Sequence, residues 1–425
     1  MSFNPPSVDA DTIIVGAGIV GCSIAYHLAE LGHTDVLVVD RGSVANPLGS
    51  TGHAPGLLGR NSGTPAMAAL AMYSAELYAR VLSDPPAFQR TGSVEVTRSA
   101  DTLRLLARKR EVALAGGIDA ELVSPERLTK LVPYLDSDGL AGGLFIPDDG
   151  VLDVRRLLQA LHEAAQDHGL AFREGVQVID FARDGDRITG VITDQGTIFA
   201  SRVIVAVGIW GRELAGKAGL DLALYPVQHP YLQTKPLPRV VTGEMRPFVR
   251  DLDNLFYLRE HGDRLGYGWY NHSPLAAEVD TTIKADLAYE DRKFDAALSY
   301  DLFPILEQTG SCRKLNGIFS MTPDGAPLLG QVDGAKGLWV AEAVWVTHAG
   351  AVGKAMAECI LDRSPSFDIT QFHLDRFASM DEQSRRHASM SLYNDIYAWP
   401  AETGDPAQVQ IKGSKAVNHD RLSLL

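Results

Sequence analysis

Cysteine is scarce in this 425-residue chain, which contains only Cys22, Cys312 and Cys359. Three scattered cysteines exclude a disulfide framework, and none has the spacing of a zinc site. No apolar run approaches the roughly 18 residues of a membrane span, and the first residues lack the pattern of a secretory signal. Basic residues are outnumbered, 39 against 53 acidic ones, and the net charge of −14 argues against nucleic-acid binding. We therefore expect a cytoplasmic protein without metal, membrane or nucleic-acid partners.

The length of the chain exceeds what one hydrophobic core usually supports, so two domains are expected. Hydrophobic residues make up 45% and charged residues 22% of the sequence, as in ordinary globular proteins. Only the last stretch, residues 401–425, is polar enough to suggest a disordered tail.

A strand–turn–helix–strand pattern opens the sequence. The β-branched run 11–15 leads into Gly16-Ala17-Gly18-Ile19-Val20-Gly21, and apolar residues then recur at helical spacing up to Gly32. A second strand, 35–39, ends at Asp40 and is followed by Arg41. The complete unit, and not the glycines alone, predicts a dinucleotide-binding site.

Each residue type in this unit has a physical role. Gly16 permits the tight turn, Gly18 lets the backbone approach a pyrophosphate, and Gly21 lets the helix pack on the strand. The helix N-terminus offers unpaired N–H groups and a partial positive charge to phosphates. The Asp40 carboxylate is expected to accept hydrogen bonds from a ribose.

Two later blocks are predicted to return to the same sheet. Residues 176–181 and 187–193 form a hairpin around the turn 184–186, and the strand 202–208 runs into Gly208. Near the C-terminus, the strand 337–341 precedes a helix expected from about His348 to Leu361. The N-terminus of that helix could stabilise negative charge on a bound cofactor. The alternative is that these are simply the last strand and helix of an α/β domain.

A further hairpin is predicted over residues 254–269. With His261-Gly262 as a two-residue turn, Tyr257 pairs with Gly266. Tyr257 and Arg259 then share one face of the hairpin, on which Gly266 and Gly268 leave space. A space beside a phenol and a guanidinium suits a small carboxylated substrate. The alternative for Arg259 is a surface arginine on an exposed face, and a one-residue change in turn length would invert the faces. The opposite, core face carries Phe256, Leu258, Leu265, Tyr267 and Trp269.

Five stretches together resemble the D-amino-acid-oxidase/sarcosine-oxidase superfamily of FAD-dependent amine oxidoreductases, closest to the flavin half of dimethylglycine oxidase and sarcosine dehydrogenase. They are residues 16–40, 49–57, 259–263, 316–325 and 341–350. The resemblance implies an α/β protein with a glutathione-reductase-type, Rossmann-like FAD-binding domain and an α+β substrate domain built on an antiparallel sheet. The FAD-binding domain is expected from residues 1–80, 150–220 and 322–365, the substrate domain from 81–149 and 221–321, and a C-terminal helix and polar tail from 366–425.

The resemblance also implies roles for individual residues. His53 matches the histidine that carries the flavin covalently, although a loop histidine bonded to nearby backbone is the alternative. Tyr257 matches an active-site tyrosine and His229 an active-site histidine that could accept the ammonium proton; a packing role for His229 stays open. Arg60 matches an arginine that holds the substrate carboxylate in sarcosine-oxidase-like relatives, but dimethylglycine-oxidase-like relatives do not keep it.

The residues expected to bind the cofactor are Gly16, Gly18, Ile19, Val20, Gly21, Asp40, Arg41, Ser50, Thr51, His53, Ala54, Gly56, Leu57, Val178, Gly208, Trp210, Gly325, Trp345, Thr347, His348 and Ala349. A cation–π site for a bulky or quaternary amine is suggested by Tyr225, Tyr231, Tyr257, Trp269 and Trp345.

The function implied is FAD-dependent oxidation of a secondary or tertiary N-methyl amino acid such as dimethylglycine or sarcosine. Hydride transfer to the flavin and hydrolysis of the iminium would release formaldehyde, and oxygen or an electron-transfer protein would reoxidise the cofactor. The larger members of the dimethylglycine oxidase and sarcosine dehydrogenase group carry a folate-binding aminomethyltransferase half to which no stretch of this sequence corresponds, so free formaldehyde is the expected one-carbon product. Alternatives are a glycine or D-amino acid oxidase, and an electron-transferring subunit of a hetero-oligomeric dehydrogenase; a homo-oligomer is also considered. An NAD-dependent dehydrogenase is disfavoured by the C-terminal resemblance.

Overall fold

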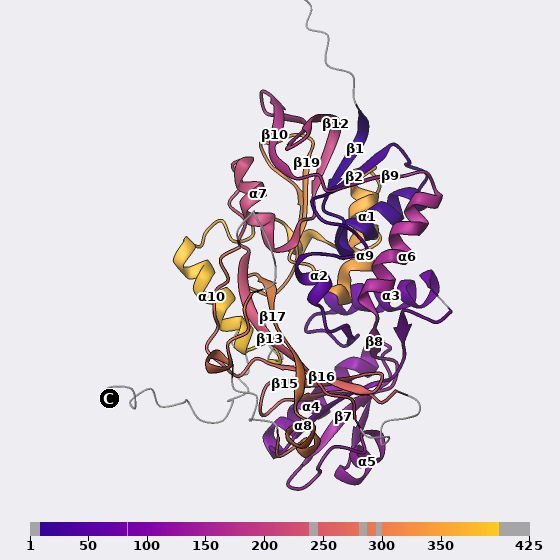
Figure 1. The fold of residues 1–425 in the computed structure, drawn as a ribbon, viewed down its shortest axis with the longest axis vertical. Helices are drawn as coiled ribbons and strands as arrows, with labels where there is room; N and C mark the ends of the chain where they lie inside the picture. Colours follow the sequence, from indigo (N-terminus) through magenta and orange to yellow (C-terminus); the bar gives the residue numbers. More distant parts are fainter. Residues whose placement is uncertain (1–8, 83, 238–244, 280–286, 295–299, 399–425) are drawn as a thin grey trace, which may run out of the picture.

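The computed structural model describes residues 9–82, 84–237, 245–279, 287–294 and 300–398. Within these residues, two large sheets follow one another along the long axis of the molecule (Figure 1). The first sheet carries the glycine-rich turn and the second carries the predicted hairpin with Tyr257. The polar tail predicted over 401–425 lies outside the described residues.

The first sheet has a parallel core. Its main path runs in the order β10 (Val178–Asp184), β11 (Arg187–Thr193), β12 (Gly196–Val205), β1 (Ala10–Val15), β2 (Val36–Asp40) and β9 (Ala171–Glu174), while β19 (Leu338–Glu342) also pairs with β12 and β18 (Leu328–Gln331) pairs with β19. β1 is parallel to β2 and to β12, and its Ile13 and Ile14 are fully buried on opposite faces. The predicted hairpin is confirmed, because Asp184 pairs with Arg187 across the turn.

Helices cover both faces of this sheet. On one face lie α1 (Ile19–Glu30), α3 (Pro65–Val81), α6 (Val154–Asp167) and α9 (Val346–Ile360), which share a hydrophobic core with Ile14 (Figure 1). On the other face, α7 (Gly211–Lys217) packs with Ile13 and Val15. This arrangement leaves the N-termini of α1 and α9 at the carboxyl ends of the parallel strands, where open α/β sheets bind ligands.

The second sheet is antiparallel except for one parallel pair, β14 with β5. Its order is β17 (Ser311–Met321), β13 (Tyr225–Thr234), β16 (Arg264–Trp269), β15 (Phe256–His261), β14 (Phe248–Asp251), β5 (Ser93–Thr97), β7 (Gly142–Ile146) and β6 (Glu121–Val123). α4 (Ala100–Ala115), α5 (Pro125–Leu131) and α8 (Pro304–Thr309) accompany it. The core face predicted for the hairpin 254–269 is confirmed, because one buried cluster contains Phe256, Leu258, Leu265, Tyr267 and Trp269.

The register of the β15–β16 hairpin differs from the prediction by two residues. His261 pairs with Arg264, so the turn is Gly262-Asp263, and Tyr257 faces Gly268 instead of Gly266. Moving the turn by one position shifts the pairing by two residues, which preserves the side-chain alternation. The faces were therefore predicted correctly although the partners were wrong.

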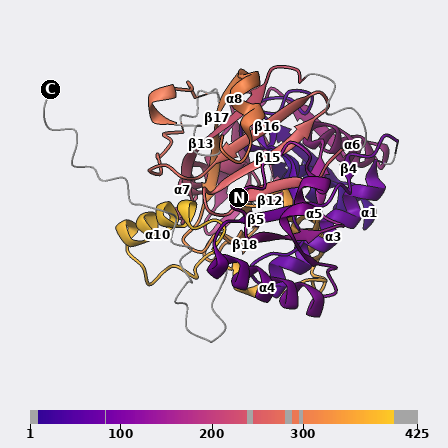
Figure 2. The same ribbon diagram turned by 90° about the horizontal axis from the view of Figure 1, so that it is seen from below.

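Short elements connect the two sheets. β3 (Leu57–Leu58), β8 (Gly150–Leu152) and β4 (Phe88–Gln89) form a three-stranded sheet beside α2 (Gly49–His53). The helix α10 (Glu382–Asn394) contacts β13 and β17 and lies on the opposite side of the molecule from α1, α3 and α6 (Figure 2). In the described part of the chain, no helix combines the length and apolar character needed to cross a bilayer.

Candidate active site

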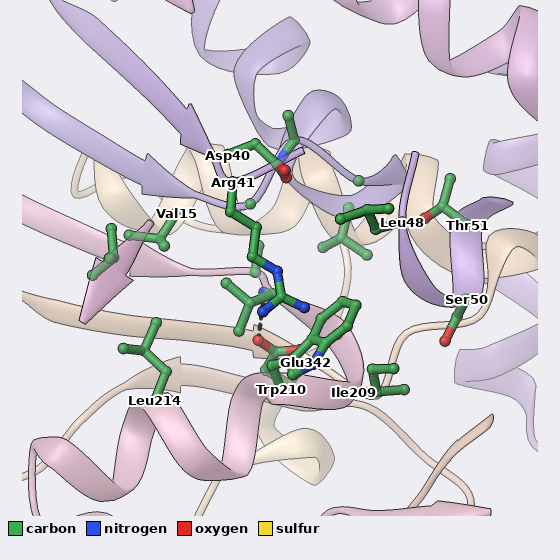
Figure 3. A pocket seen from close by; sticks show the side chains of 18 of the residues that line it. Val15, Asp40, Arg41, Leu48, Ser50, Thr51, Ile209, Trp210, Leu214 and Glu342 are labelled. Atoms are coloured by element: carbon green, nitrogen blue, oxygen red, sulfur yellow. Dashed lines mark hydrogen bonds between the residues drawn. The ribbon is translucent and has the colours of Figure 1, made fainter. Parts of the chain in front are cut away.

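A cavity of about 320 Å³ lies at the carboxyl ends of β1 and β2. Its wall contains the turn 16–20, Asp40 and Arg41, together with Val178 and residues 208–210. Asp40, Arg41, Ile209 and Trp210 are labelled in Figure 3. These predicted cofactor residues come from segments almost 200 positions apart, and the parallel pairing of β1 with both β2 and β12 brings them together.

The glycine turn is held as tightly as its predicted role requires. Gly16 has a φ of 105°, and a Cβ there would lie 2.3 Å from the carbonyl oxygen of Ala206. A Cβ on Gly21 would lie 1.9 Å from the Gly16 oxygen. The Asp40 carboxylate accepts hydrogen bonds from the backbone N–H groups of Ala17 at 2.7 Å and Gly42 at 2.6 Å. Asp40 thus fixes the turn and also faces the cavity in which a ribose is predicted.

Glu342 is a cavity residue that the sequence did not reveal. Its buried carboxyl group accepts a hydrogen bond from the Val207 N–H at 2.7 Å, and burial raises its pKa well above the usual value. Nearby, the Arg41 guanidinium lies 4.0 Å from the centre of the Trp210 ring. Figure 3 shows these side chains converging on the lower part of the cavity.

A second, larger cavity of about 890 Å³ adjoins the first. Ile19, Ser50, Thr51 and Ser320 line both, so the cavity at the glycine turn adjoins the cavity at the second sheet. Of the predicted cofactor residues, His53, Ala54, Gly56, Leu57, Gly325, Trp345, Thr347 and His348 line the larger cavity. Ala349 is fully buried in the α9 packing.

The adjoining cavities suit an extended dinucleotide. The N-terminus of α1 and the close-packed glycine turn form a cradle at one end, where side chains larger than hydrogen would clash. At the other end, the first turn of α9 presents His348, whose pKa burial lowers to about 4. His348 is therefore neutral near pH 7, and it adds no charge where a flavin ring would lie.

One row of paired residues forms the floor of the larger cavity. Tyr231 pairs with Gly268, Gly268 with Tyr257, Tyr257 with Arg250, and Arg250 with Glu95, so successive strands contribute to one face. All of these side chains except the glycine line the cavity. The space beside the glycines is not vacant as predicted, because a Cβ on Gly268 would lie 2.4 Å from the Tyr257 hydroxyl and one on Gly266 would lie 2.0 Å from the Tyr231 hydroxyl.

His229 and Tyr257 are brought together at this floor. The Nε2 atom of His229 lies 2.7 Å from the Tyr257 hydroxyl, and the two rings are stacked with their centres 5.7 Å apart. Both side chains are buried, and burial places the pKa of His229 well below 6.5. The site thus presents a neutral imidazole beside a phenol.

Two predicted substrate arginines lie elsewhere. Arg259 shares the face of Tyr257, but its Nη1 donates to the carbonyl oxygens of Pro55 and Leu152 at 2.7 and 2.9 Å. Arg60 forms an ion pair with Asp148 at 2.9 Å. Neither arginine is among the described residues that line the larger cavity.

Arg250 is the guanidinium that reaches the cavity in their place. It lies beside Tyr257 on the neighbouring strand and forms a 3.5 Å ion pair with Glu95, which Lys109 also contacts at 2.5 Å. Two cations therefore share one carboxylate at this wall. The sequence signal for Arg250 was weak, because its position depends on the pairing of β14 with β15.

The aromatic residues divide between the cavity and the packing of other elements. Tyr231, Tyr257 and Trp345 line the cavity as predicted, and Tyr270, Phe319 and Tyr397 join them. Trp269 lies on the core face of the sheet, and the Tyr225 hydroxyl donates to Glu382. Aromatic rings thus surround the His229–Tyr257 pair.

Comparison with curated proteins identifies relatives of this chain. It is 33% identical over 388 residues to 4-methylaminobutanoate oxidase (formaldehyde-forming) of Paenarthrobacter nicotinovorans, covering 89% of this chain and 47% of that protein. It is 28% identical over 424 residues to mitochondrial dimethylglycine dehydrogenase of Rattus norvegicus, covering 94% and 49%. The chain spans about half the length of these relatives. They confirm the predicted resemblance.

Solved structures confirm the predicted fold class. L-proline dehydrogenase from P. horikoshii superimposes with a TM-score of 0.80 at 23% identity, covering 88% of this chain and 98% of that one. Glycine oxidase from Geobacillus kaustophilus gives 0.75 at 24% identity, covering 87% and 99%. The family model described as DAO, FAD dependent oxidoreductase, matches residues 11–359. Because that match includes both the glycine turn and the cavity floor, the chain belongs to the DAO family of FAD-dependent oxidoreductases.

Proposed function

We propose that this protein oxidises an N-methylated amino acid, dimethylglycine or sarcosine being the first candidates, to an iminium that hydrolyses to an amine and formaldehyde. The observation that carries the proposal is the floor of the larger cavity, where neutral His229 and Tyr257 lie beside the cationic Arg250. Oxygen or an electron-transfer protein accepts the electrons in the end. The named activity of the 4-methylaminobutanoate oxidase supports the N-methyl class of substrate.

The FAD would lie across both cavities. The turn 16–21 and Asp40 would hold its pyrophosphate and ribose, and the first turn of α9 would face the flavin ring. When bound, the flavin supplies the acceptor for the two electrons that leave the amine as a hydride. His53 ends α2 in the wall of the larger cavity, two residues beyond Thr51, which lines both cavities. We assign it the covalent link through the 8α-methyl group.

The covalent link is tested by acid precipitation of the purified holoprotein. Yellow colour should remain with the wild-type pellet and move to the supernatant for His53→Ala. Colour released from the wild type would overturn the role of His53 and leave FAD binding intact.

Arg250 would hold the substrate carboxylate and so place the amine over the Tyr257–His229 pair. A guanidinium binds a carboxylate through two parallel hydrogen bonds, and hydrogen bonds to charged groups contribute about 1.5–3 kcal/mol. The contact of Arg250 with Glu95 is 3.5 Å long, and Lys109 pairs with the same carboxylate, so Glu95 keeps a counter-charge when Arg250 binds a substrate carboxylate.

The experiment is an anaerobic screen of N-methyl amines for bleaching of the flavin. Sarcosine, dimethylglycine and 4-methylaminobutanoate are compared with glycine and with N-methyl amines of equal size that lack a carboxylate. Formaldehyde should accompany turnover, whereas ammonia from glycine or a D-amino acid would contradict the proposal. Arg250→Met should lower kcat/KM about tenfold or more for carboxylated amines only. Arg187→Met, at an exposed position, is the matched control.

A further inference from the structure

Four side chains are hydrogen-bonded in series from the cavity floor, past the helix α10, to a partly exposed histidine. The Tyr257 hydroxyl lies 2.7 Å from Nε2 of His229, whose Nδ1 lies 2.7 Å from the Tyr393 hydroxyl. That hydroxyl lies 2.9 Å from Nε2 of His272. Tyr257, His229 and Tyr393 are buried, whereas His272 is partly exposed. The series therefore leads from buried groups of the cavity floor to a side chain at the surface.

The direction of every bond in this series follows from its last contact. Nδ1 of His272 lies 2.9 Å from the carbonyl oxygen of Ser273, which can only accept, so Nδ1 carries the hydrogen. Burial lowers the pKa of His272, so the ring is neutral and its Nε2 is an acceptor. Tyr393 therefore donates to His272 and accepts from Nδ1–H of His229.

The same reasoning gives the direction of the hydrogen bond between His229 and Tyr257 in the cavity. Because His229 is neutral and uses its hydrogen on Tyr393, its Nε2 must accept from the Tyr257 hydroxyl. The Tyr257 oxygen then turns its lone pairs toward the cavity. An ammonium group bound in the cavity could therefore donate to the Tyr257 oxygen. From Tyr257 onward, each hydrogen bond in the series is donated in the direction of His272.

The groups packed around the series oppose a resting positive charge within it. Tyr270, Tyr397 and Phe319 surround His229 and Tyr257, and Arg250 is the cation on the neighbouring strand. Phe294 packs on His272 with ring centres 5.0 Å apart. Burial raises the pKa of both Tyr270 and Tyr397, so neither tyrosine supplies a compensating anion. A proton entering at Tyr257 is therefore best held at His272, next to solvent.

We propose that Tyr257, His229, Tyr393 and His272 form a proton wire that carries the ammonium proton of the substrate to the surface. The inference rests on the proposed amine oxidation. As the substrate N–H bond breaks, an O–H bond forms on Tyr257. The hydrogen of Tyr257 passes to Nε2 of His229, that of Nδ1 to Tyr393, and that of Tyr393 to Nε2 of His272. One positive charge moves from the substrate nitrogen to His272, and no electrons are transferred.

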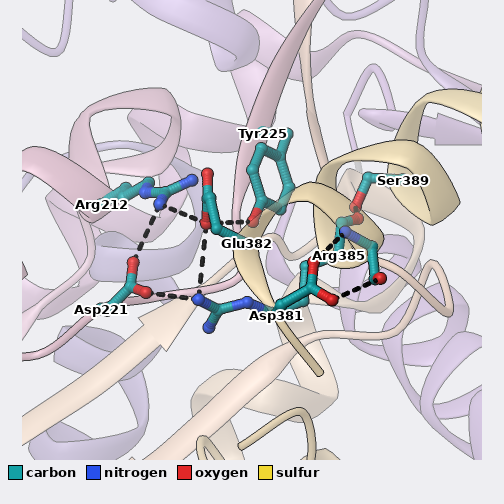
Figure 4. Close-up of polar contacts among 8 residues, drawn as sticks. Arg212, Asp221, Tyr225, Asp381, Glu382, Arg385 and Ser389 are labelled. Carbon is teal, nitrogen blue, oxygen red and sulfur yellow. Dashed lines mark hydrogen bonds and ion pairs between the residues drawn. The ribbon is translucent and has the colours of Figure 1, made fainter. Parts of the chain in front are cut away.

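The helix α10 brings Tyr393 into this series and is anchored at both ends. At its N-terminal end, Glu382 accepts from Arg212 and from the Tyr225 hydroxyl, and Arg385 binds Asp221 (Figure 4). At its C-terminal end, Asn394 donates to the carbonyl oxygens of Tyr270 and His272 at 2.6 and 2.9 Å. Tyr393 and His272 are positioning residues in this scheme, since they act on the substrate only through Tyr257.

The first test measures flavin reduction against pH in three holoprotein variants. Tyr393→Phe keeps the ring but breaks the wire, and His272→Gln keeps an acceptor that cannot be protonated. In both variants, the rate of flavin reduction at pH 7 should be about tenfold or more below the wild-type rate. At high pH, where the amine arrives neutral, the rate should approach that of the wild type. Tyr225→Phe, which also removes a hydroxyl that contacts α10, is the control and should keep the wild-type profile.

A second test does not depend on activity. In ¹⁵N-histidine NMR spectra, His229 and His272 should both carry hydrogen on Nδ1 and none on Nε2, with His229→Gln and His272→Gln assigning the signals. Hydrogen on Nε2 of either ring, or a wild-type pH profile for Tyr393→Phe, would overturn the wire. If no N-methyl amine reduces the flavin of the wild type, the proposed function is wrong. The proton wire is then tested by measuring the pH profile of flavin reduction with another amine that does reduce the flavin.

Discussion

Replacing Gly268 by alanine tests the packing of the cavity floor. A Cβ at this position would lie 2.4 Å from the Tyr257 hydroxyl, 2.6 Å from Cζ of the same ring and 2.8 Å from the carbonyl oxygen of Pro230. The carbonyl belongs to β13, which pairs along its length with β17. The phenol of Tyr257 must therefore move by the larger distance, while the Pro230 carbonyl must give way by a few tenths of an ångström.

The size of the effect follows from these distances. Ordinary contact begins at 3.4 Å, so the hydroxyl must retreat by about 1 Å, enough to break its 2.7 Å bond to His229. Misplacing a reacting group by about 1 Å costs on the order of 10²-fold in rate. Overpacking a core position costs about 1–3 kcal/mol of stability. We expect a folded but slow enzyme.

The assay combines thermal unfolding of the holoprotein with the rate of anaerobic flavin reduction by its amine substrate. Gly268→Ala should lose most of the rate while melting a few degrees lower. Gly216→Ala is the matched control, because its Cβ meets nothing within 4 Å and alanine favours the helix α7. A Gly268→Ala variant with a wild-type rate would refute the placement of Tyr257.

Three further predictions concern other parts of the molecule. Gly353→Ala places a Cβ 2.6 Å from Ser23, so α1 and α9 must separate, and urea unfolding should show a loss of about 1–3 kcal/mol. In a His53→Ala background, which lacks the proposed covalent link, Asp40→Ala removes two hydrogen bonds to the glycine turn and should weaken FAD binding in a titration of apoprotein, whereas Asp180→Ala on the outer hairpin should not. As the pH drops from 6.5 toward 4, buried histidines should lower the free energy of unfolding, because their lowered pKa keeps them neutral until unfolding lets them take up protons. Asp149 and Asp251 act in the opposite direction, since burial raises the pKa of each to about 6. The histidine contribution is therefore measured as the difference in pH dependence between the wild type and His27→Gln or His261→Gln, and an unchanged pH dependence in both variants would contradict the lowered histidine pKa values.

Local patterns predicted those parts of the molecule in which neighbours in sequence interact. The glycine turn, the strand that ends at Asp40 and the hairpin around Gly185 were all predictable, because a turn and its flanking alternation depend on a few adjacent residues. The core face of β15 and β16 was predictable for the same reason, since period-two alternation survives a shift of two residues.

The composition of the cavity required the tertiary structure. Arg259 and Arg250 are both strand arginines near Tyr257, and the alternation of β15 favoured Arg259. The pairing of β14 with β15 sets Arg250 beside Tyr257, while Arg259 bonds the carbonyl oxygens of the small sheet. Such a choice depends on which strands become neighbours, which no single strand encodes.

The sequence by itself determined the dinucleotide turn, the two kinds of sheet and the Tyr257–His229 candidates. Only the tertiary structure set the two cavities beside each other, brought Arg250 to the floor and placed Tyr393, 164 residues from His229, within 2.7 Å of it. The physical reason is range: a turn is stabilised by contacts within a few residues, whereas a substrate cavity is made where distant strands and helices meet as they bury their apolar faces.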